Sequence, residues 1–180
     1  MTVDPTIALA GRLLGGLVFA TAVAGKLRHR HELAGVVANY RLLPEWLAAT
    51  AAWVIVGLEC LVALSLLSGV WLTAGATLAI VLLGGFALAM AINLARGRRE
   101  IDCGCFQLGL RQRLSAGLVV RNLVLAIILV PLLTAAAAGA TALQWIDGLG
   151  AGLAAYVLYQ VLGEIVSLRH LSADLRRRFA

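Results

Sequence analysis

Long apolar stretches alternate with short polar gaps along the whole chain. Each stretch holds about 20 residues or more, and a helix of that length is enough to cross a hydrocarbon layer roughly 30 Å thick. The pattern therefore predicts an all-α integral membrane helical bundle with five transmembrane helices, a four-helix core plus one. The expected spans are residues 5–26, 45–67, 70–95, 115–138 and 143–168, and a basic tail follows at residues 169–180.

Prolines and short connections indicate where these spans begin and bend. Pro5 and Pro44 suit the first turn of a helix, and Pro131 is expected to kink the fourth span. Only "SGV" separates the second span from the third, which predicts a tight antiparallel hairpin. The first apolar run also resembles a secretory signal, but Asp4 and the lack of lysine or arginine before Arg12 favour a retained span.

The composition excludes a soluble globular domain. Hydrophobic residues make up 62% of the chain and charged residues only 13%, outside the usual balance of soluble proteins. We therefore expect a single transmembrane domain over residues 1–180. The net charge of +6 does not indicate a nucleic-acid partner, because the basic residues lie in the gaps between apolar runs rather than on one face of a folded module. The expected partner of these residues is the lipid bilayer.

Lysine and arginine occur in alternate gaps. Residues 26–41 hold four of them, residues 96–113 hold five and the segment after residue 168 holds four, whereas the gaps between hold none. Cytoplasmic loops of membrane proteins carry the excess of basic residues. The N-terminus is therefore expected outside the cytoplasm, and the C-terminus and the 96–113 loop on the cytoplasmic side.

Two of the three cysteines, Cys103 and Cys105, flank Gly104 within the polar segment "REIDCGCFQLGLRQR". Gly104 lowers the backbone cost of joining cysteines this close, because glycine adopts positive φ. A strained disulfide in a short ring is easily reduced, which suits thiol–disulfide exchange. Cys103 and Cys105 are therefore the predicted redox pair. Two thiolates could also bind a soft metal ion such as Cu(I), or the pair could be a structural turn; no nearby histidine completes a zinc site.

Ionisable residues inside the spans are the next signal. Arg12 and Glu59 are expected at a similar depth of about 10–12 Å from the outer ends of the first and second spans. Because a charge in hydrocarbon is costly unless it is paired or hydrated, the two are predicted to form a salt bridge, which either fixes helix packing or lines a polar cavity. Cys60, about 22 Å up the second span, is expected to be a buried apolar thiol, with a second redox or metal station as the alternative.

A second polar set is expected towards the cytoplasmic ends of the spans, near the cysteine pair: Lys26, Asn93, Arg121, Asn122 and Glu164. Arg121 is predicted to pair with Glu164, to steady a thiolate, or to extend towards the lipid headgroups. Glycines are expected to permit close contact between helices, among them Gly15, Gly16, Gly84 and Gly85.

Five segments between residues 18 and 125 follow one another in a recognisable order: "VFATAVAGKLRH", "NYRLLP", "GLECLVALSLL", "DCGCF" and "LVVRNLVL". In this order they resemble the methylamine utilisation protein MauE family, which is related in general appearance to DoxX-like membrane proteins. The CGCF sequence with a following Arg-Asn pair is the most specific part. The chain departs from the family pattern after CGCF, where Gln107 and Leu108 precede Gly109.

The resemblance implies a multi-pass protein of the bacterial inner membrane that assists maturation of the disulfide-rich small subunit of methylamine dehydrogenase, beside a thioredoxin-like partner. By position, Cys103 and Cys105 would be its redox pair, supported by Gly104, Arg121 and Asn122. No cofactor is expected, and no classical catalytic motif identifies an enzyme. Subunit maturation takes place outside the cytoplasm, whereas the basic residues place the cysteine loop inside.

Two hypotheses of other classes stay open beside the thiol–disulfide factor. The first is a membrane carrier for a soft metal ion or small solute, with the cysteine pair as entry ligand and Arg12 and Glu59 lining the path. The second is a purely structural membrane subunit, for which both loop cysteines would tolerate serine.

Overall fold

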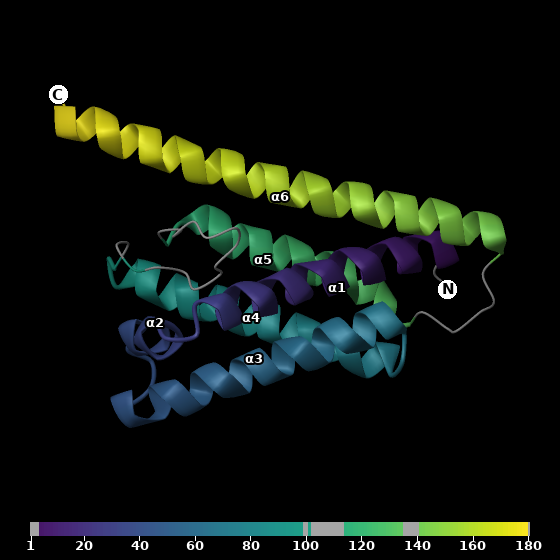
Figure 1. Cartoon of the computed structure of the whole chain (residues 1–180), viewed down its shortest axis with the longest axis horizontal. Helices are drawn as coiled ribbons and strands as arrows, with labels where there is room; N and C mark the ends of the chain where they lie inside the picture. Colours follow the sequence, from purple (N-terminus) through teal and green to yellow (C-terminus); the bar gives the residue numbers. More distant parts are fainter. Residues whose placement is uncertain (1–3, 99–100, 102–113, 135–140, 180) are drawn as a thin grey trace.

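The computed structural model describes residues 4–98, 101, 114–134 and 141–179, with side chains described as far as Ile165. Within these ranges the chain is all-helical (Figure 1). The elements are α1 (Pro5–Arg28), α2 (Leu33–Asn39), α3 (Glu45–Ser68), α4 (Leu72–Ala95), α5 (Ala116–Leu129), the 3-10 helix η2 (Val130–Leu133) and α6 (Ala142–Phe179).

Among the described residues, five helical segments are long and apolar enough to span a membrane: α1, α3, α4, α5 continued by η2, and α6. The predicted fold class and number of spans are therefore confirmed. Pro131 acts differently from the expected kink, since the α-helix changes at Val130 into a short 3-10 helix. The last helix is longer than the predicted span to residue 168, because α6 continues as a helix of 38 residues through the basic tail to Phe179.

Local sequence explains several of the helix ends. Asp4 caps α1, its Oδ1 accepting a hydrogen bond from the Thr6 backbone N–H at 2.8 Å, as short polar side chains do at helix starts. Gly69 ends α3 with φ of 78°, a left-handed conformation that glycine adopts without strain. The Ser65 hydroxyl donates to the Val70 carbonyl at 2.7 Å across this turn. The predicted α3–α4 hairpin is thus confirmed.

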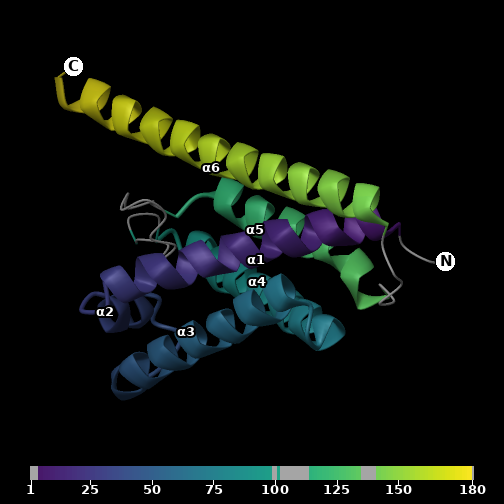
Figure 2. The ribbon, with the colours of Figure 1, turned by 45° about the vertical axis from the view of Figure 1, so that its right-hand side comes forward.

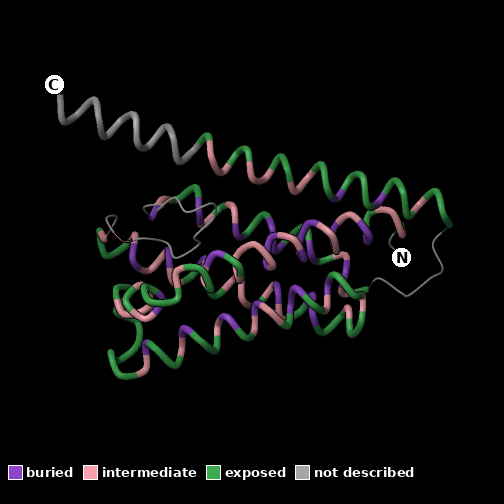
Figure 3. The backbone as a smooth tube through the Cα atoms, in the orientation of Figure 1, coloured by how far each residue is buried: buried purple, intermediate pink, exposed green. Residues whose placement is uncertain are grey.

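The core lies where α1, α3, α4 and α5 meet. Helix α1 packs against both α3 and α6, and α4 packs against α5 (Figures 1 and 2). Buried positions lie mainly on the faces that the helices turn towards one another (Figure 3). The shared cluster includes Leu14, Phe19, Val62, Leu66, Leu83 and Leu129. Large apolar side chains on the outward faces are exposed, as expected for surfaces that contact lipid.

Helix α2 is an element that hydropathy did not predict. It lies in the basic gap between the first two spans, and Leu33 buries its side chain against Ala52 and Val56 of α3. Seven residues are too few for an amphipathic period to stand out in a segment rich in charges. Helix α2 therefore depends on α3 for its stability.

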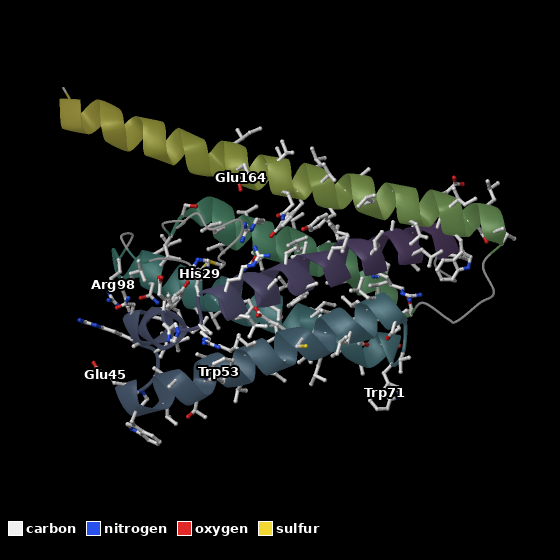
Figure 4. All side chains as sticks on the ribbon, viewed as in Figure 1. His29, Glu45, Trp53, Trp71, Arg98 and Glu164 are labelled. Atoms are coloured by element: carbon white, nitrogen blue, oxygen red, sulfur yellow. The ribbon has the colours of Figure 1, made fainter. Side chains whose placement is uncertain are left out.

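The bundle has two distinct ends. The N-terminus and the α3–α4 turn lie at one end, called here the N-terminal end, and α2, the end of α4 and the C-terminus lie at the other, the α2 end (Figure 1). Trp46 at the start of α3 is 78% exposed and Trp71 in the α3–α4 turn is 83% exposed. Helix α3 separates them by about 33 Å, close to the thickness of a hydrocarbon core. Tryptophan is enriched at both membrane interfaces, so the two mark the expected interfaces, and Figure 4 shows Trp71 extending from its end.

Candidate functional site

A buried ion pair joins α1 to α3 in the interior of the bundle. The Lys26 Nζ lies 2.7 Å from Oε1 and 2.8 Å from Oε2 of Glu59, and Glu59 is only 1% exposed. The same ammonium lies 5.8 Å from the centre of the Phe86 ring on α4, a favourable distance for a cation–π contact. Three helices therefore contribute to one charge-compensated site.

The predicted salt bridge between Arg12 and Glu59 is wrong. The Arg12 Nε donates instead to the Leu66 carbonyl at 3.2 Å, near the α3–α4 turn, where its guanidinium also lies against Gly69. Leu66 is seven residues from Glu59, or about 10 Å along a helix. The reason is an offset between the helices: α1 extends past α3 at the N-terminal end and α3 extends past α1 at the α2 end (Figure 1). Arg12 and Glu59 therefore bind different partners, the Leu66 carbonyl and Lys26.

A cavity of about 170 Å³ lies beside the Lys26 side chain. Helix α2, the segment after it, and helices α3 and α4 form its wall, which is apolar apart from Lys26 and Tyr40. Ile55 and Phe86 contribute from α3 and α4. Leu42 and Leu43 also line the cavity and are 39% and 44% exposed, so this part of its wall lies at the molecular surface.

Polar side chains at the end of α4 bind one another and the backbone. Asn93 is fully buried; its amide nitrogen donates to the Ala89 carbonyl at 3.1 Å, and its oxygen accepts from Arg98 Nη1 at 3.3 Å. His29 and Arg98 both lie at this end of the molecule (Figure 4). Asn93 is thus placed at the α2 end, as expected, and serves there to hold the C-terminal turn of α4.

Arg121 and Asn122 lie early in α5. The Arg121 guanidinium is 5.4 Å from the centre of the Tyr159 ring on α6, and Asn122 is buried. Arg121 therefore links the core helix α5 to the outer helix α6. Its expected pairing with Glu164 or with a thiolate stays a prediction.

The cysteine pair itself lies outside the described residues, as do Gly104, Gln107 and Leu108. The residues that bracket it are described: the Leu114 N–H donates to the Ile101 carbonyl at 3.1 Å. Leu114 and Leu118 pack with Met90 in a small cluster that Ile101, Tyr40 and Phe86 also contact. Ile101 and Leu114, the described residues on either side of the segment that carries Cys103 and Cys105, therefore lie together where α4 ends and α5 begins, at the α2 end.

Cys60 is a free, half-buried thiol on α3, more exposed than the buried thiol expected from the sequence. No group of three or more histidine, cysteine or acidic side chains that could hold a metal ion occurs within the described part of the chain. Cys60 alone cannot therefore be assigned a metal.

Sequence reasoning missed the partner of Glu59. The sequence places Lys26 in the polar set towards the membrane surface, because it ends the first predicted span. The missing information is the relative height of α1 and α3. Lys26 and Glu59 carry opposite charges in neighbouring spans, which is a sequence signal that the two could pair. Hydropathy does not give the height of one helix relative to the other, so it could not select this pairing.

Comparisons with known proteins agree on one family. The family model described as Methylamine utilisation protein MauE matches residues 4–135. The Methylamine utilization protein MauE of Paracoccus denitrificans is 40% identical over 159 residues, covering 87% of this chain and 86% of the relative. The protein of the same name from Paracoccus versutus is 39% identical over 181 aligned positions, covering 97% of each. That from Methylorubrum extorquens is 44% identical over 124 residues, covering 69% of this chain and 67% of the relative. No solved structure matches this chain significantly.

Proposed function

Because the chain belongs to the methylamine utilisation protein MauE family, we propose that it is a thiol–disulfide factor of the bacterial inner membrane in methylamine utilisation. Its client is the disulfide-rich small subunit of methylamine dehydrogenase, and a thioredoxin-like protein works beside it. Cys103 and Cys105 are the exchanging pair.

The observation that carries this proposal is the contact between the two described residues that flank the cysteine segment, Ile101 and Leu114. The hydrogen bond between Leu114 and Ile101 holds together the two ends of a segment in which Cys103 follows Ile101 by only two residues. Leu114 and Ile101 also pack in the apolar cluster around Met90. The two described residues that flank the cysteine segment are therefore held together at the packed ends of α4 and α5, which supports docking of a partner protein at this end of the bundle.

The chemistry needs only the two thiols and a partner disulfide. One cysteine, as the thiolate, attacks a sulfur of the partner and forms a mixed disulfide while the other partner sulfur leaves as a thiolate. The second cysteine then attacks its neighbour in the mixed disulfide, which oxidises the pair and releases the partner as a dithiol. The reverse sequence oxidises the partner and reduces the pair.

Serine variants test the assignment. In a host that grows on methylamine, Cys103→Ser and Cys105→Ser each leave one thiol of the pair, so one of the two variants is expected to accumulate a mixed disulfide. It would appear as a slower band on non-reducing electrophoresis that dithiothreitol removes, and mass spectrometry would identify the bound protein.

Cys60→Ser is the matched control, because Cys60 lies on α3 and is the third and last thiol of the chain. It should trap nothing and leave methylamine dehydrogenase activity unchanged. Full dehydrogenase activity in the Cys103→Ser/Cys105→Ser double variant would disprove the proposal.

A further inference from the structure

The cavity beside Lys26 has the composition of a small-molecule site rather than of a packing defect. Its walls are apolar, and one charged side chain, Lys26, reaches it. Pockets for small ligands are typically apolar with a few polar groups that fix orientation. We propose that this cavity binds a neutral, membrane-soluble ring compound, with a carbonyl oxygen that accepts a hydrogen bond from Lys26.

The size of the cavity sets the size of the occupant. Its volume is about 170 Å³, and an apolar cavity of about 150 Å³ in another protein binds benzene. A single six-membered ring with a small substituent therefore fits. Phe86 and Tyr40 in the wall offer ring surfaces against which such a group can pack.

The ion pair determines the polarity of the occupant. An ammonium has three N–H donors, and Glu59 engages the Lys26 Nζ through two oxygens at 2.7 and 2.8 Å. In this proposal the third N–H, on an ammonium that lies beside Phe86 in the cavity wall, donates to an occupant of the cavity. Because Glu59 already compensates the Lys26 charge, an anionic occupant would add an excess negative charge in a low-dielectric interior. A neutral acceptor, such as a carbonyl oxygen, adds none.

The exposed part of the cavity wall indicates how such a molecule reaches the site. Leu42 and Leu43 line the cavity, are partly exposed, and lie between α2 and α3. Trp46, four residues beyond Leu42, marks this end of α3 as the membrane interface. A compound dissolved in the bilayer can therefore enter from the interfacial region. This site is independent of the cysteine pair and of the proposed exchange reaction.

Binding of two matched probes tests the proposal. The full-length protein in phosphatidylcholine nanodiscs is titrated against 4-fluoroacetophenone and, separately, 4-fluoroethylbenzene, and fluorine NMR line broadening is compared with empty nanodiscs. The ketone is expected to bind about tenfold more tightly than the hydrocarbon, because a hydrogen bond from a charged donor contributes roughly that factor.

Three variants assign the binding to the cavity. Ala89→Phe fills it and should abolish the broadening of both probes, whereas Ala74→Phe, at an exposed position of the same helix, should bind like the wild type. Lys26→Met/Glu59→Met removes both charges together and should equalise the two affinities. Equal affinities in the wild type, or broadening unchanged by Ala89→Phe, would overturn the proposal, even if Cys103 and Cys105 prove to be the exchange pair.

Discussion

At the scale of single residues, the buried carboxylate of Glu59 depends on the Lys26 ammonium to compensate its charge. It is almost fully buried, in a segment expected to lie in hydrocarbon, and it binds Lys26 through both carboxylate oxygens. Removing two charges from water is costly, and the attraction between them offsets that cost only when the geometry is good. The pair is therefore more important for keeping each charge compensated than for net stability.

Glu59→Gln should be strongly destabilising for this reason, since it leaves the Lys26 ammonium buried without a counter-charge. We expect a loss of about 3 kcal/mol in the free energy of unfolding, measured by titration with sodium dodecyl sulfate in mixed micelles. Lys26→Met/Glu59→Met, which removes both charges, should lose less than about 1 kcal/mol, because replacing a whole buried pair by apolar residues is often neutral.

Glu45→Gln is the control for the Glu59 variant. It makes the same change on the same helix, at an exposed first-turn position (Figure 4), where surface substitutions shift stability by about 0.5 kcal/mol or less. Equal stability of Glu59→Gln and Glu45→Gln would contradict the role assigned to the pair.

At the scale of elements, glycines decide how closely helices approach. A Cβ on Gly15 would lie 2.9 Å from a Leu129 methyl and one on Gly16 would lie 2.6 Å from a Leu67 methyl, which confirms the expected close contacts for these two. The expectation is wrong for Gly84 and Gly85, where a Cβ would meet nothing within 4 Å. A glycine in a membrane helix thus permits close helix packing only if it lies on a face that is turned towards a neighbouring helix. The sequence alone does not show which face that is.

Helix α6 packs closely on α1 at Gly152, and Gly152→Val should weaken that contact. A Cβ at Gly152 would lie 2.8 Å from the Ala10 carbonyl and 2.9 Å from the Leu13 Cβ, so valine must push α6 away from α1. We expect a cost of about 1–3 kcal/mol, as for other overpacked interiors, seen as a lower thermal unfolding midpoint.

Gly150→Val is the matched control for α6, because a Cβ at Gly150 meets nothing within 4 Å. Both variants introduce the same residue two positions apart, so helix propensity cancels in the comparison. If Gly150→Val lowers the midpoint as much as Gly152→Val does, the contact between α1 and α6 is not the cause.

At the scale of the whole molecule, the two ends differ in charge. The basic gap with α2, the ends of α4 and α5 that flank the cysteine segment in the sequence, and the end of α6 belong to the same end of the bundle (Figure 1). The five spans alternate in direction, so one orientation brings all three basic segments to the same membrane face. The positive-inside rule predicts that this face is the cytoplasmic one, in which case a client matured outside would require a relay across the bilayer.

Reporter fusions test this orientation. Green fluorescent protein fused after Ala180 should fluoresce and alkaline phosphatase at the same position should be inactive, because the C-terminus is expected in the cytoplasm. A cysteine introduced at Ser68, near the opposite end, should react with a membrane-impermeant maleimide in intact cells when the native cysteines are replaced by serine.

The opposite pattern, an active phosphatase at the C-terminus and a protected Ser68→Cys, would reverse the orientation. Cys103 and Cys105 would then face the compartment in which the client matures, and no relay would be required. The exchange chemistry proposed for the pair would be unchanged by that outcome.

The five spans, the α3–α4 hairpin and the family can all be predicted from the amino-acid sequence alone. These features are local: a membrane helix satisfies its backbone hydrogen bonds within one segment, so hydropathy is enough to locate it. The segment with Cys103 and Cys105 stood out for the same reason, as a polar interruption between two such helices.

The partner of Glu59, the cavity beside Lys26 and the position of α2 depend on how the helices pack together. Each depends on the height of one helix relative to another, and that offset follows from packing between residues distant in the sequence. Lys26 and Glu59 are 33 positions apart, and a shift of two helical turns would have placed Arg12 beside Glu59 instead. Hydropathy is nearly uniform along a span, so it carries no information about such a shift.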